Sequence, residues 1–222
     1  MTLAAANRVD QAVAQLKSDI LANRLPPGFQ ATEPEFALRL GMSRTPVREA
    51  LLRLAHDGLI EMIPRRGARV LPVRARDMAD IYEILTALEP QAAACLAARP
   101  IGERGLDRLG DLQDRMESAL AADDLDAWAA ADDAFHRALL VQHGNLRMLS
   151  ISETLMDQAH RARMITLRLR DRPDQSTRDH RAILTALRNG DAPRARALFH
   201  DHRTRAAQEL LRLLDTYRLP QL

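Results

Sequence analysis

Cysteine, aromatic residues and long apolar runs are scarce in this sequence. Cys95 is the single cysteine among 222 residues, which excludes an internal disulfide, and we expect this thiol to lie buried on a helix. No stretch of about 18 apolar residues predicts a membrane span, and the N-terminus lacks the apolar run of a signal peptide. We therefore expect a cytoplasmic protein with no membrane partner.

The abundant residues favour helix, and the charged residues are distributed unevenly along the chain. Aromatic residues make up 3% of the chain, whereas Ala, Leu and Arg dominate it. Residues 1–75 hold 11 basic and 7 acidic side chains, and the remainder holds 21 basic and 23 acidic ones. A positive N-terminal part beside a slightly negative remainder indicates a polyanionic partner for the N-terminal part alone.

Residues 1–74 carry the pattern of a winged helix-turn-helix. Apolar residues at helical spacing predict a first helix that ends at LPPG (25–28). Thr32 and Gly41 are expected to cap the second helix, and Pro34 is tolerated in its first turn. A third helix is expected over 42–58, followed by strands over 59–63 and 68–73 that flank the turn 64–67. The very short connection between the second and third helices fixes their crossing.

Residues 75–222 are expected to be entirely helical. Asp77 is a candidate cap for a helix over 74–99, in which Pro90 predicts a kink. Further helices are expected over 103–121, 124–143, 145–169, 176–189 and 191–215. The predicted fold class is therefore mostly α, with the winged helix-turn-helix joined through PVRAR (72–76) to an antiparallel six-helix bundle.

Basic and hydroxyl side chains gather where a helix-turn-helix meets DNA. Arg44 and Arg48 lie one turn apart on the third helix, opposite its apolar stripe. Arginines there can read guanine edges in the major groove, and the nearby hydroxyls can hold phosphates. Two arginines on an isolated helix are ordinarily solvated surface, but here a basic wing follows them. The candidate DNA-binding residues are Ser43, Arg44, Thr45, Arg48, Arg65, Arg66 and Gly67, the last permitting close approach of backbone to a groove.

The second part contains a possible metal site. Asp132 and His136 stand four residues apart, so both project from one helical face. His180 and His202 each lie on an apolar stripe and are expected to point into the bundle. One oxygen and three nitrogen ligands suit zinc, nickel, cobalt or manganese. Each of these residues singly has another interpretation as an ordinary core side chain, and His160 also points inwards.

The N-terminal segment LPPGFQATEPEFALRLGMSRTPVREALLRLAHDGLIEMIPRRGARV resembles the winged helix of the GntR family of bacterial transcription regulators. The SRTPVREAL core and the LxxDGL pattern carry the resemblance. It implies that Arg44 and Arg48 contact bases, that Ser43 and Thr45 contact phosphates, and that Arg66-Gly67 enters the minor groove. Many members have an arginine where this chain has Pro34, so a DNA contact from that position is not expected.

The second part resembles the FCD effector domain of FadR-like GntR regulators. The segments that carry this resemblance are IYEILTALEPQAAACLAA, DDAFHRALLVQHGN and DHRAILTALRNGDAPRARALFHDH. It implies a divalent metal held by Asp132, His136, His180 and His202, with positions left for a small carboxylate effector. Leu85 replaces an arginine found in many members. His160 and Arg163 are candidates for lining the effector cavity.

The leading interpretation is a homodimeric, ligand-responsive regulator that acts as a repressor and not as an enzyme. Its two winged helices would bind a pseudo-palindromic operator in double-stranded DNA. One alternative is a metal-dependent hydrolase-like bundle fused to a DNA reader, but for its general base only Glu153 and Asp157 lie near in sequence. Another alternative is a bundle that only dimerises.

Overall fold

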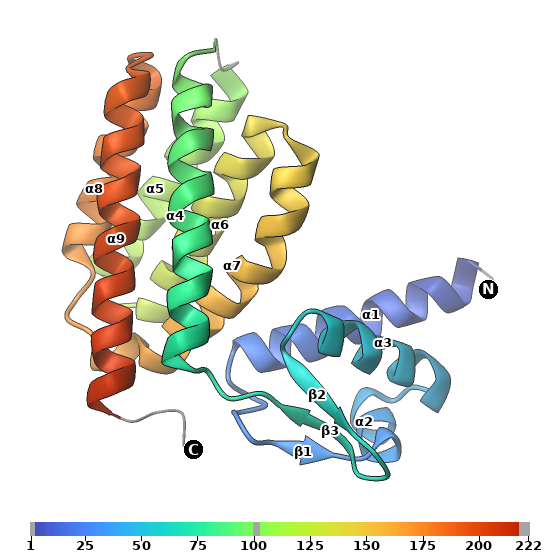
Figure 1. Cartoon of the computed structure of the whole chain (residues 1–222). Helices are drawn as coiled ribbons and strands as arrows, with labels where there is room; N and C mark the ends of the chain where they lie inside the picture. Colours follow the sequence, from blue (N-terminus) through green and yellow to red (C-terminus); the bar gives the residue numbers. More distant parts are fainter. Residues whose placement is uncertain (1–2, 100–102, 218–222) are drawn as a thin grey trace. The chain divides into compact units, whose positions relative to one another are not determined.

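The computed structural model describes residues 3–99 and 103–217, which are mostly helical (Figure 1). This confirms the predicted fold class. The chain divides between Arg74 and Ala75 into two compact units. None of the helices among the described residues is long and apolar enough to cross a bilayer.

The N-terminal unit contains three helices and a small antiparallel sheet. Its elements are α1 (Leu3–Leu21), β1 (Gln30–Ala31), α2 (Glu33–Leu40), α3 (Arg44–His56), β2 (Ile60–Ile63) and β3 (Gly67–Val70). The sheet order is β1-β3-β2, so β3 pairs with a strand on each side. The sequence predicted only the β2–β3 hairpin, because a two-residue strand such as β1 has too few residues to show an alternating pattern.

A capping box starts α2, as the sequence predicted in part. The backbone N–H of Glu35 donates to Thr32 Oγ1 at 3.4 Å, and the Thr32 N–H donates to Glu35 Oε2 at 2.7 Å. Pro34 lies in the first turn, where its missing N–H costs nothing, and Gly41 ends the helix at φ +62°. Helices α2 and α3 are thus separated by only three residues, 41–43.

Gly67 is required by packing inside this unit. Its φ is +85°, and a Cβ atom there would lie 2.0 Å from the carbonyl oxygen of Ala31. Gly67 therefore lets β3 pair closely with β1. From the sequence, we expect glycine at this position to allow the backbone to approach a DNA groove. The structure adds an intramolecular reason for glycine, which is the close pairing of β3 with β1.

The C-terminal unit is a bundle of helices. Its elements are α4 (Ala75–Ala97), α5 (Glu103–Ala121), α6 (Leu125–His143), α7 (Leu146–Thr166), the 3₁₀ turn η1 (Leu167–Leu169), α8 (Asp174–Arg188) and α9 (Ala192–Thr216). In Figure 1, α4 and α9 run side by side, with α5, α6 and α8 behind them. Side chains of Asp124, Asn145 and Asp191 cap α6, α7 and α9.

Two details differ from the sequence predictions. Asp77 lies in the first turn of α4 and not at its cap, because the helix already begins at Ala75. Pro90 lies inside α4, as expected, and the kink there stays a prediction. Cys95 is half-buried and not fully buried, and its sulfur accepts a hydrogen bond from Gln91 Nε2 at 3.1 Å. These differences do not change the bundle topology.

Candidate functional site

The N-terminal end of α3 presents the predicted DNA-binding side chains to solvent. The face of α3 that packs into the unit is apolar and at most 1% exposed, and it consists of Val47, Ala50, Leu51 and Leu54. Ser43, Arg44, Thr45 and Arg48 are exposed on other faces. Ser43 is the N-cap residue, but its side chain makes no capping hydrogen bond, so the hydroxyl remains available to a phosphate. Their role in binding stays a prediction.

Arg48 has one acidic neighbour. Its Nε lies 3.7 Å from Glu33 Oε1, and the Arg48 side chain is 68% exposed. A pair this exposed contributes little to stability. Arg48 can therefore leave Glu33 for a base at small cost.

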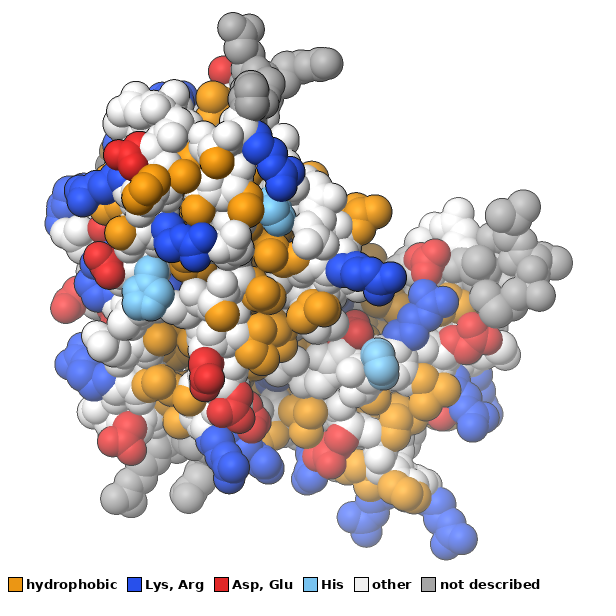
Figure 2. All heavy atoms as spheres, turned by 45° about the horizontal axis from the view of Figure 1, so that its top comes forward, with side chains coloured by type: hydrophobic (Ala, Val, Ile, Leu, Met, Phe, Trp, Pro, Cys, Tyr) orange, Lys and Arg blue, Asp and Glu red, His pale blue; other side chains and the backbone are white. Residues whose placement is uncertain are grey.

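The turn between β2 and β3 carries two exposed arginines. The Arg66 N–H donates to the Ile63 carbonyl at 2.9 Å, which closes the turn around Pro64 and Arg65. Within the described part of the chain, neither Arg65 nor Arg66 forms an ion pair. Basic side chains project from the lower tip of the smaller unit in Figure 2. The turn is thus a basic wing, and no acidic side chain among the described residues neutralises its two arginines.

Arg65→Gly should stabilise the protein yet weaken DNA binding. Arg65 has φ +64°, a left-handed conformation that costs a residue with a side chain about 1 kcal/mol. Glycine removes this cost and also one positive charge. Urea denaturation should show the gain, and DNA titrations should show a salt dependence reduced by about one charge. Arg66→Gly is the matched control, with the charge lost but no gain in stability; equal stability changes in both variants would contradict the strain at Arg65.

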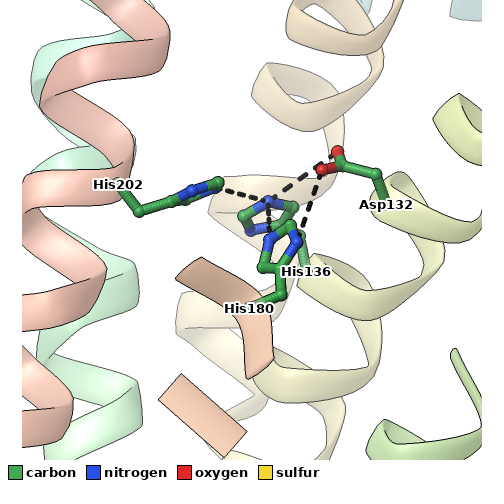
Figure 3. Close-up of side chains that lie close together, drawn as sticks. All are labelled: Asp132, His136, His180 and His202. Atoms are coloured by element: carbon green, nitrogen blue, oxygen red, sulfur yellow. Dashed lines mark hydrogen bonds and ion pairs between the residues drawn. The ribbon is translucent and has the colours of Figure 1, made fainter. Parts of the chain in front are cut away.

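The four predicted metal ligands meet in the bundle (Figure 3). Asp132 and His136 come from α6, His180 from α8 and His202 from α9. One ligand atom from each lies within 4.8 Å of the others, and all four residues are at most 3% exposed. The predicted inward orientation of the three histidines is therefore observed. Their use as metal ligands stays a prediction.

Three histidine nitrogens converge on one point. His136 Nε2 lies 3.3 Å from His180 Nε2 and 3.4 Å from His202 Nε2. The carboxylate of Asp132 closes the fourth side, with Oδ2 3.8 Å from His136 Nε2 and Oδ1 3.8 Å from His180 Nδ1. Phe135 packs against the His180 ring at 4.7 Å between centroids. The polar atoms are thus grouped inside an apolar surround.

Two further carboxylates orient the imidazoles. Glu89 of α4 lies with Oε1 3.1 Å from His136 Nδ1, and Asp179 of α8 lies with Oδ2 3.4 Å from His202 Nδ1. A carboxylate at Nδ1 favours the tautomer in which Nδ1–H donates to it. In both histidines this leaves the lone pair of Nε2 directed at the centre of the cluster.

Glu89 is itself held by a buried arginine. Arg203 Nη2 donates to Glu89 Oε1 at 2.7 Å, and Arg203 Nε donates to Oε2. Both residues are at most 2% exposed. Burial alone would raise the pKa of Glu89, but the charge of Arg203 and the hydrogen bonds from His136 and Arg203 outweigh it and lower that pKa to about 2. Glu89 therefore stays an anion that can accept the His136 proton in a hydrogen bond.

Near neutral pH the cluster side chains are in the protonation states of metal ligands. Burial lowers the pKa of His136, lowers that of His180 further, and lowers that of His202 to about 4 against the opposing charge of Asp132. The pKa of Asp132 is lowered despite its burial, chiefly by Arg163. Near neutral pH the cluster therefore offers three neutral imidazoles and a carboxylate, which is the protonation state that metal ligands need.

A hydrogen-bond deficit also fits a metal. His180 Nδ1 is buried and has no hydrogen-bond partner among the described residues. His136 Nε2 and His202 Nε2 lie 3.4 Å apart, and a hydrogen bond between them needs a proton on one of the two atoms. Because both imidazoles carry their proton on Nδ1, neither Nε2 atom can donate. Buried polar atoms normally have partners. A divalent cation bound by His136 Nε2 and His202 Nε2 would remove the unfavourable contact between these two acceptors.

A cavity of about 270 Å³ adjoins the cluster. Asp132, His202 and Arg163 form part of its wall, and Arg163 Nη1 lies 2.6 Å from Asp132 Oδ2. His160 is not among the lining residues, and its Nδ1 lies 4.0 Å from Asp133 Oδ1. Of the two candidate effector residues, the structure thus brings Arg163 to the cavity and leaves His160 outside its wall.

The structure also shows the surroundings of Leu85 and Asp157, two residues discussed in the sequence analysis. Leu85, where many family members have an arginine, is fully buried in α4, and a positive charge reaches the cluster from Arg163 on α7. Asp157, considered as a general base, is paired with Arg137 at 2.9 Å. Asp157 is therefore engaged in an ion pair instead of being free for proton transfer.

The sequence did not point to Glu89, Asp179 or Arg203 as parts of the site. Glu89 and Arg203 are 114 residues apart, so no helical spacing links them. A carboxylate inside the apolar segment LTALEPQAAA was the only indication that Glu89 is unusual. The partners of the predicted ligands thus became visible only in the folded structure.

Glu89→Gln should weaken metal binding without removing a ligand. The neutral amide is a poorer acceptor for His136 and leaves Arg203 with less compensation, so we expect about a 10- to 100-fold loss of Zn²⁺ affinity. Competition against a chelating dye measures this. Glu83→Gln, on the exposed face of the same helix, is the control. Equal affinities in the two variants would contradict the orienting role of Glu89.

Comparison with known proteins places both units in described families. The family model described as "Bacterial regulatory proteins, gntR family" matches residues 8–70, and the model described as "FCD domain" matches residues 80–205. An uncharacterized HTH-type transcriptional regulator in the TAR-I ttuE-ttuC' intergenic region of Agrobacterium vitis is 41% identical, covering 63% of this chain and 82% of the relative. The HTH-type transcriptional repressor RspR of Escherichia coli (strain K12) is 32% identical, covering 80% of this chain and 78% of the relative.

A solved structure supports the fold. E. coli McbR/YncC superposes with a TM-score of 0.82 at 23% identity, covering 93% of this chain and 98% of that chain. The matched families and relatives are regulators of transcription and not enzymes, which removes the ground for the hydrolase alternative. The chain belongs to the GntR family of DNA-binding transcriptional regulators and carries the FCD domain of that family.

Proposed function

We propose that this regulator is a homodimeric repressor whose operator affinity is controlled by a small carboxylate bound at a metal centre in residues 75–222. Residues 1–74 bind double-stranded DNA, and the two winged helices of the dimer bind a pseudo-palindrome. The observation that carries the proposal is the buried cluster of Asp132, His136, His180 and His202 beside a cavity. A site of this composition, enclosed on one side and open to a cavity on the other, suits ligand sensing.

At the DNA end, each group has a defined task. Arg44 and Arg48 donate to base edges in the major groove, while the hydroxyls of Ser43 and Thr45 hold phosphates. Arg65 and Arg66 place positive charge at the adjacent minor groove. Gly67 has no side chain, so the backbone of the wing can approach the groove closely. This division of contacts makes the arginines of α3 the source of specificity and the wing a source of affinity.

At the effector end, the chain's own residues hold and orient the ligand. The four cluster residues would hold a divalent cation such as zinc, nickel, cobalt or manganese. When bound, the cation supplies a Lewis acid to which a carboxylate oxygen can coordinate. Arg163, on the cavity wall, donates hydrogen bonds to the same carboxylate. Glu89 and Asp179 keep two imidazoles in the binding tautomer.

Control of DNA binding requires two states with different effector affinities. Effector binding would favour a dimer in which the two recognition helices no longer match the spacing of the half-sites. By linkage, DNA must weaken effector binding by the same factor. A coupling of roughly 5- to 150-fold is the usual range.

The test is an operator titration with and without effector. An operator is first selected from random duplex DNA with the full chain, and its affinity is measured by fluorescence anisotropy on metal-loaded protein. A panel of small carboxylates should contain members that lower operator affinity, and chelation of the metal should abolish their effect. Operator affinity that is unaffected by every acid, in protein shown to contain metal, would support a bundle that only dimerises.

A further inference from the structure

We propose that Glu33 is a positioning residue for Arg48: its carboxylate holds the Nε side of the guanidinium, so that the two Nη groups face the base. This inference rests on the proposed base contact of Arg48 and adds a residue of α2 that sets its specificity. Glu33 is the first residue of α2, and Arg48 lies in the second turn of α3. Glu33 therefore acts across the two helices of the motif and touches no base itself.

The two arginines that are expected to read bases differ in their surroundings. Arg48 Nε lies 3.7 Å from Glu33 Oε1. In the parts of the chain that the structure describes, the Arg44 side chain has no ion pair, and Glu33 has no ionic partner besides Arg48. A change at Glu33 therefore acts on one of the two arginines and leaves the other as an internal reference.

The backbone at Glu33 is held from both sides. Thr32 caps α2, and its N–H donates to Glu35 Oε2 at 2.7 Å, while Pro34 has a fixed φ in the first turn. The Glu33 side chain is 30% exposed, whereas that of Arg48 is 68% exposed. A negative charge at a helix N-terminus is also favoured by the helix dipole. The carboxylate is thus the more confined partner and can restrict the guanidinium.

The contact at Nε leaves the other donors of Arg48 free. A guanidinium has one N–H on Nε and two on each Nη, and a guanine accepts two hydrogen bonds at O6 and N7. Because Glu33 lies next to Nε, the Nη groups can bind guanine while the ion pair persists. In the free protein this exposed pair is weak. Bound DNA excludes water from it, which strengthens the attraction between Glu33 and Arg48.

A carboxylate in this place raises specificity in two ways. A long arginine side chain loses rotamer freedom when it binds, and Glu33 reduces that loss for the one orientation that it holds. Glu33 also brings a negative charge to the surface that meets the phosphates, so it weakens binding to DNA of any sequence. Both effects increase the ratio of operator affinity to random-DNA affinity.

The experiment measures base preference at each position of the operator half-site. Duplexes that carry every single base-pair change in the selected operator are titrated against the full chain by fluorescence anisotropy. Arg48→Ala and Arg44→Ala first identify the base pair whose preference each arginine sets. Glu33→Gln should reduce the preference at the Arg48 base pair about 3- to 10-fold and leave that at the Arg44 base pair unchanged. Combining Glu33→Gln with Arg48→Ala should give the same preference as Arg48→Ala alone.

Glu49→Gln is the matched control. Glu49 follows Arg48 on α3, is half-buried and forms no ion pair within the described residues, so loss of its charge should strengthen binding to random DNA without changing any base preference. Equal base preferences in Glu33→Gln and Glu49→Gln, or a loss of preference at both arginine base pairs, overturns the positioning inference and leaves the base contact of Arg48 standing. If Arg48→Ala weakens operator and random DNA equally, the proposed base contact fails together with this inference.

Discussion

His202→Ala is expected to remove bound metal from the protein, whereas His200→Ala is expected to leave it in place. The two histidines are two residues apart on α9, but His202 is 3% exposed and contributes Nε2 to the cluster, while the His200 side chain is 57% exposed. Loss of a direct ligand should exceed the roughly 10- to 100-fold effect of losing an orienting partner. Elemental analysis of protein purified without chelator or histidine tag should find about one ion per chain in the control and very little in His202→Ala.

Measurements beyond metal content separate loss of the ligand from loss of the fold. Far-UV circular dichroism should be alike for the two variants, and addition of Zn²⁺ should raise the melting temperature of His200→Ala only, since a ligand that binds the native state stabilises it. Equal metal content in the two variants would exclude His202 as a ligand. If the unaltered protein binds no zinc, nickel or manganese even after reconstitution, Asp132 and the three histidines would be ordinary core residues.

Replacing Arg44 and Arg48 together with alanine should abolish sequence-specific DNA binding. Each arginine that contacts a guanine contributes about 1–3 kcal/mol of discrimination, so the double variant should lose roughly 2–6 kcal/mol at the operator. Both side chains are exposed, and the apolar face of α3 is untouched, so stability should change little. Anisotropy titrations on operator and on random duplex, at several salt concentrations, measure the loss.

Arg53→Ala is the control on the same helix. Arg53 Nη1 is 2.7 Å from Asp10 Oδ1, so this arginine joins α3 to α1. Its loss should leave the ratio of operator to random-DNA affinity unchanged. If the double variant instead loses affinity equally on both DNAs, and its salt dependence falls by about two charges, Arg44 and Arg48 contact phosphates and the specificity must come from other residues.

Several features of the fold and of the site could be predicted from local sequence. The capping of α2 by Thr32 and Gly41 follows from side-chain and backbone chemistry within one or two turns. The common face of Asp132 and His136 follows from their spacing of four residues on a helix. The inward orientation of His180 and His202 follows from the apolar stripes on which they lie. Each of these predictions needs only the periodicity of a single element.

The tertiary structure decided which residues complete the site. The pair of Glu89 and Arg203 joins α4 to α9, and the contact of Asp179 with His202 joins α8 to α9. Strand β1 is defined by its pairing with β3, in which Gln30 lies opposite Arg69 and Ala31 opposite Ala68. None of these contacts has a spacing rule, since the partners lie in different elements whose relative position depends on the packing of the whole unit.

The sequence by itself therefore determined the succession of helices, the basic face of α3, and the three histidines and one aspartate that point inwards. Only the tertiary structure decided that these four residues meet within 4.8 Å and that Glu89 and Asp179 orient two of the imidazoles. The physical reason is one of range. Local hydrogen bonding and hydrophobic periodicity act over a few residues along the chain. A buried charge instead needs a partner of opposite charge, and the packing of different helices determines which residue that partner is.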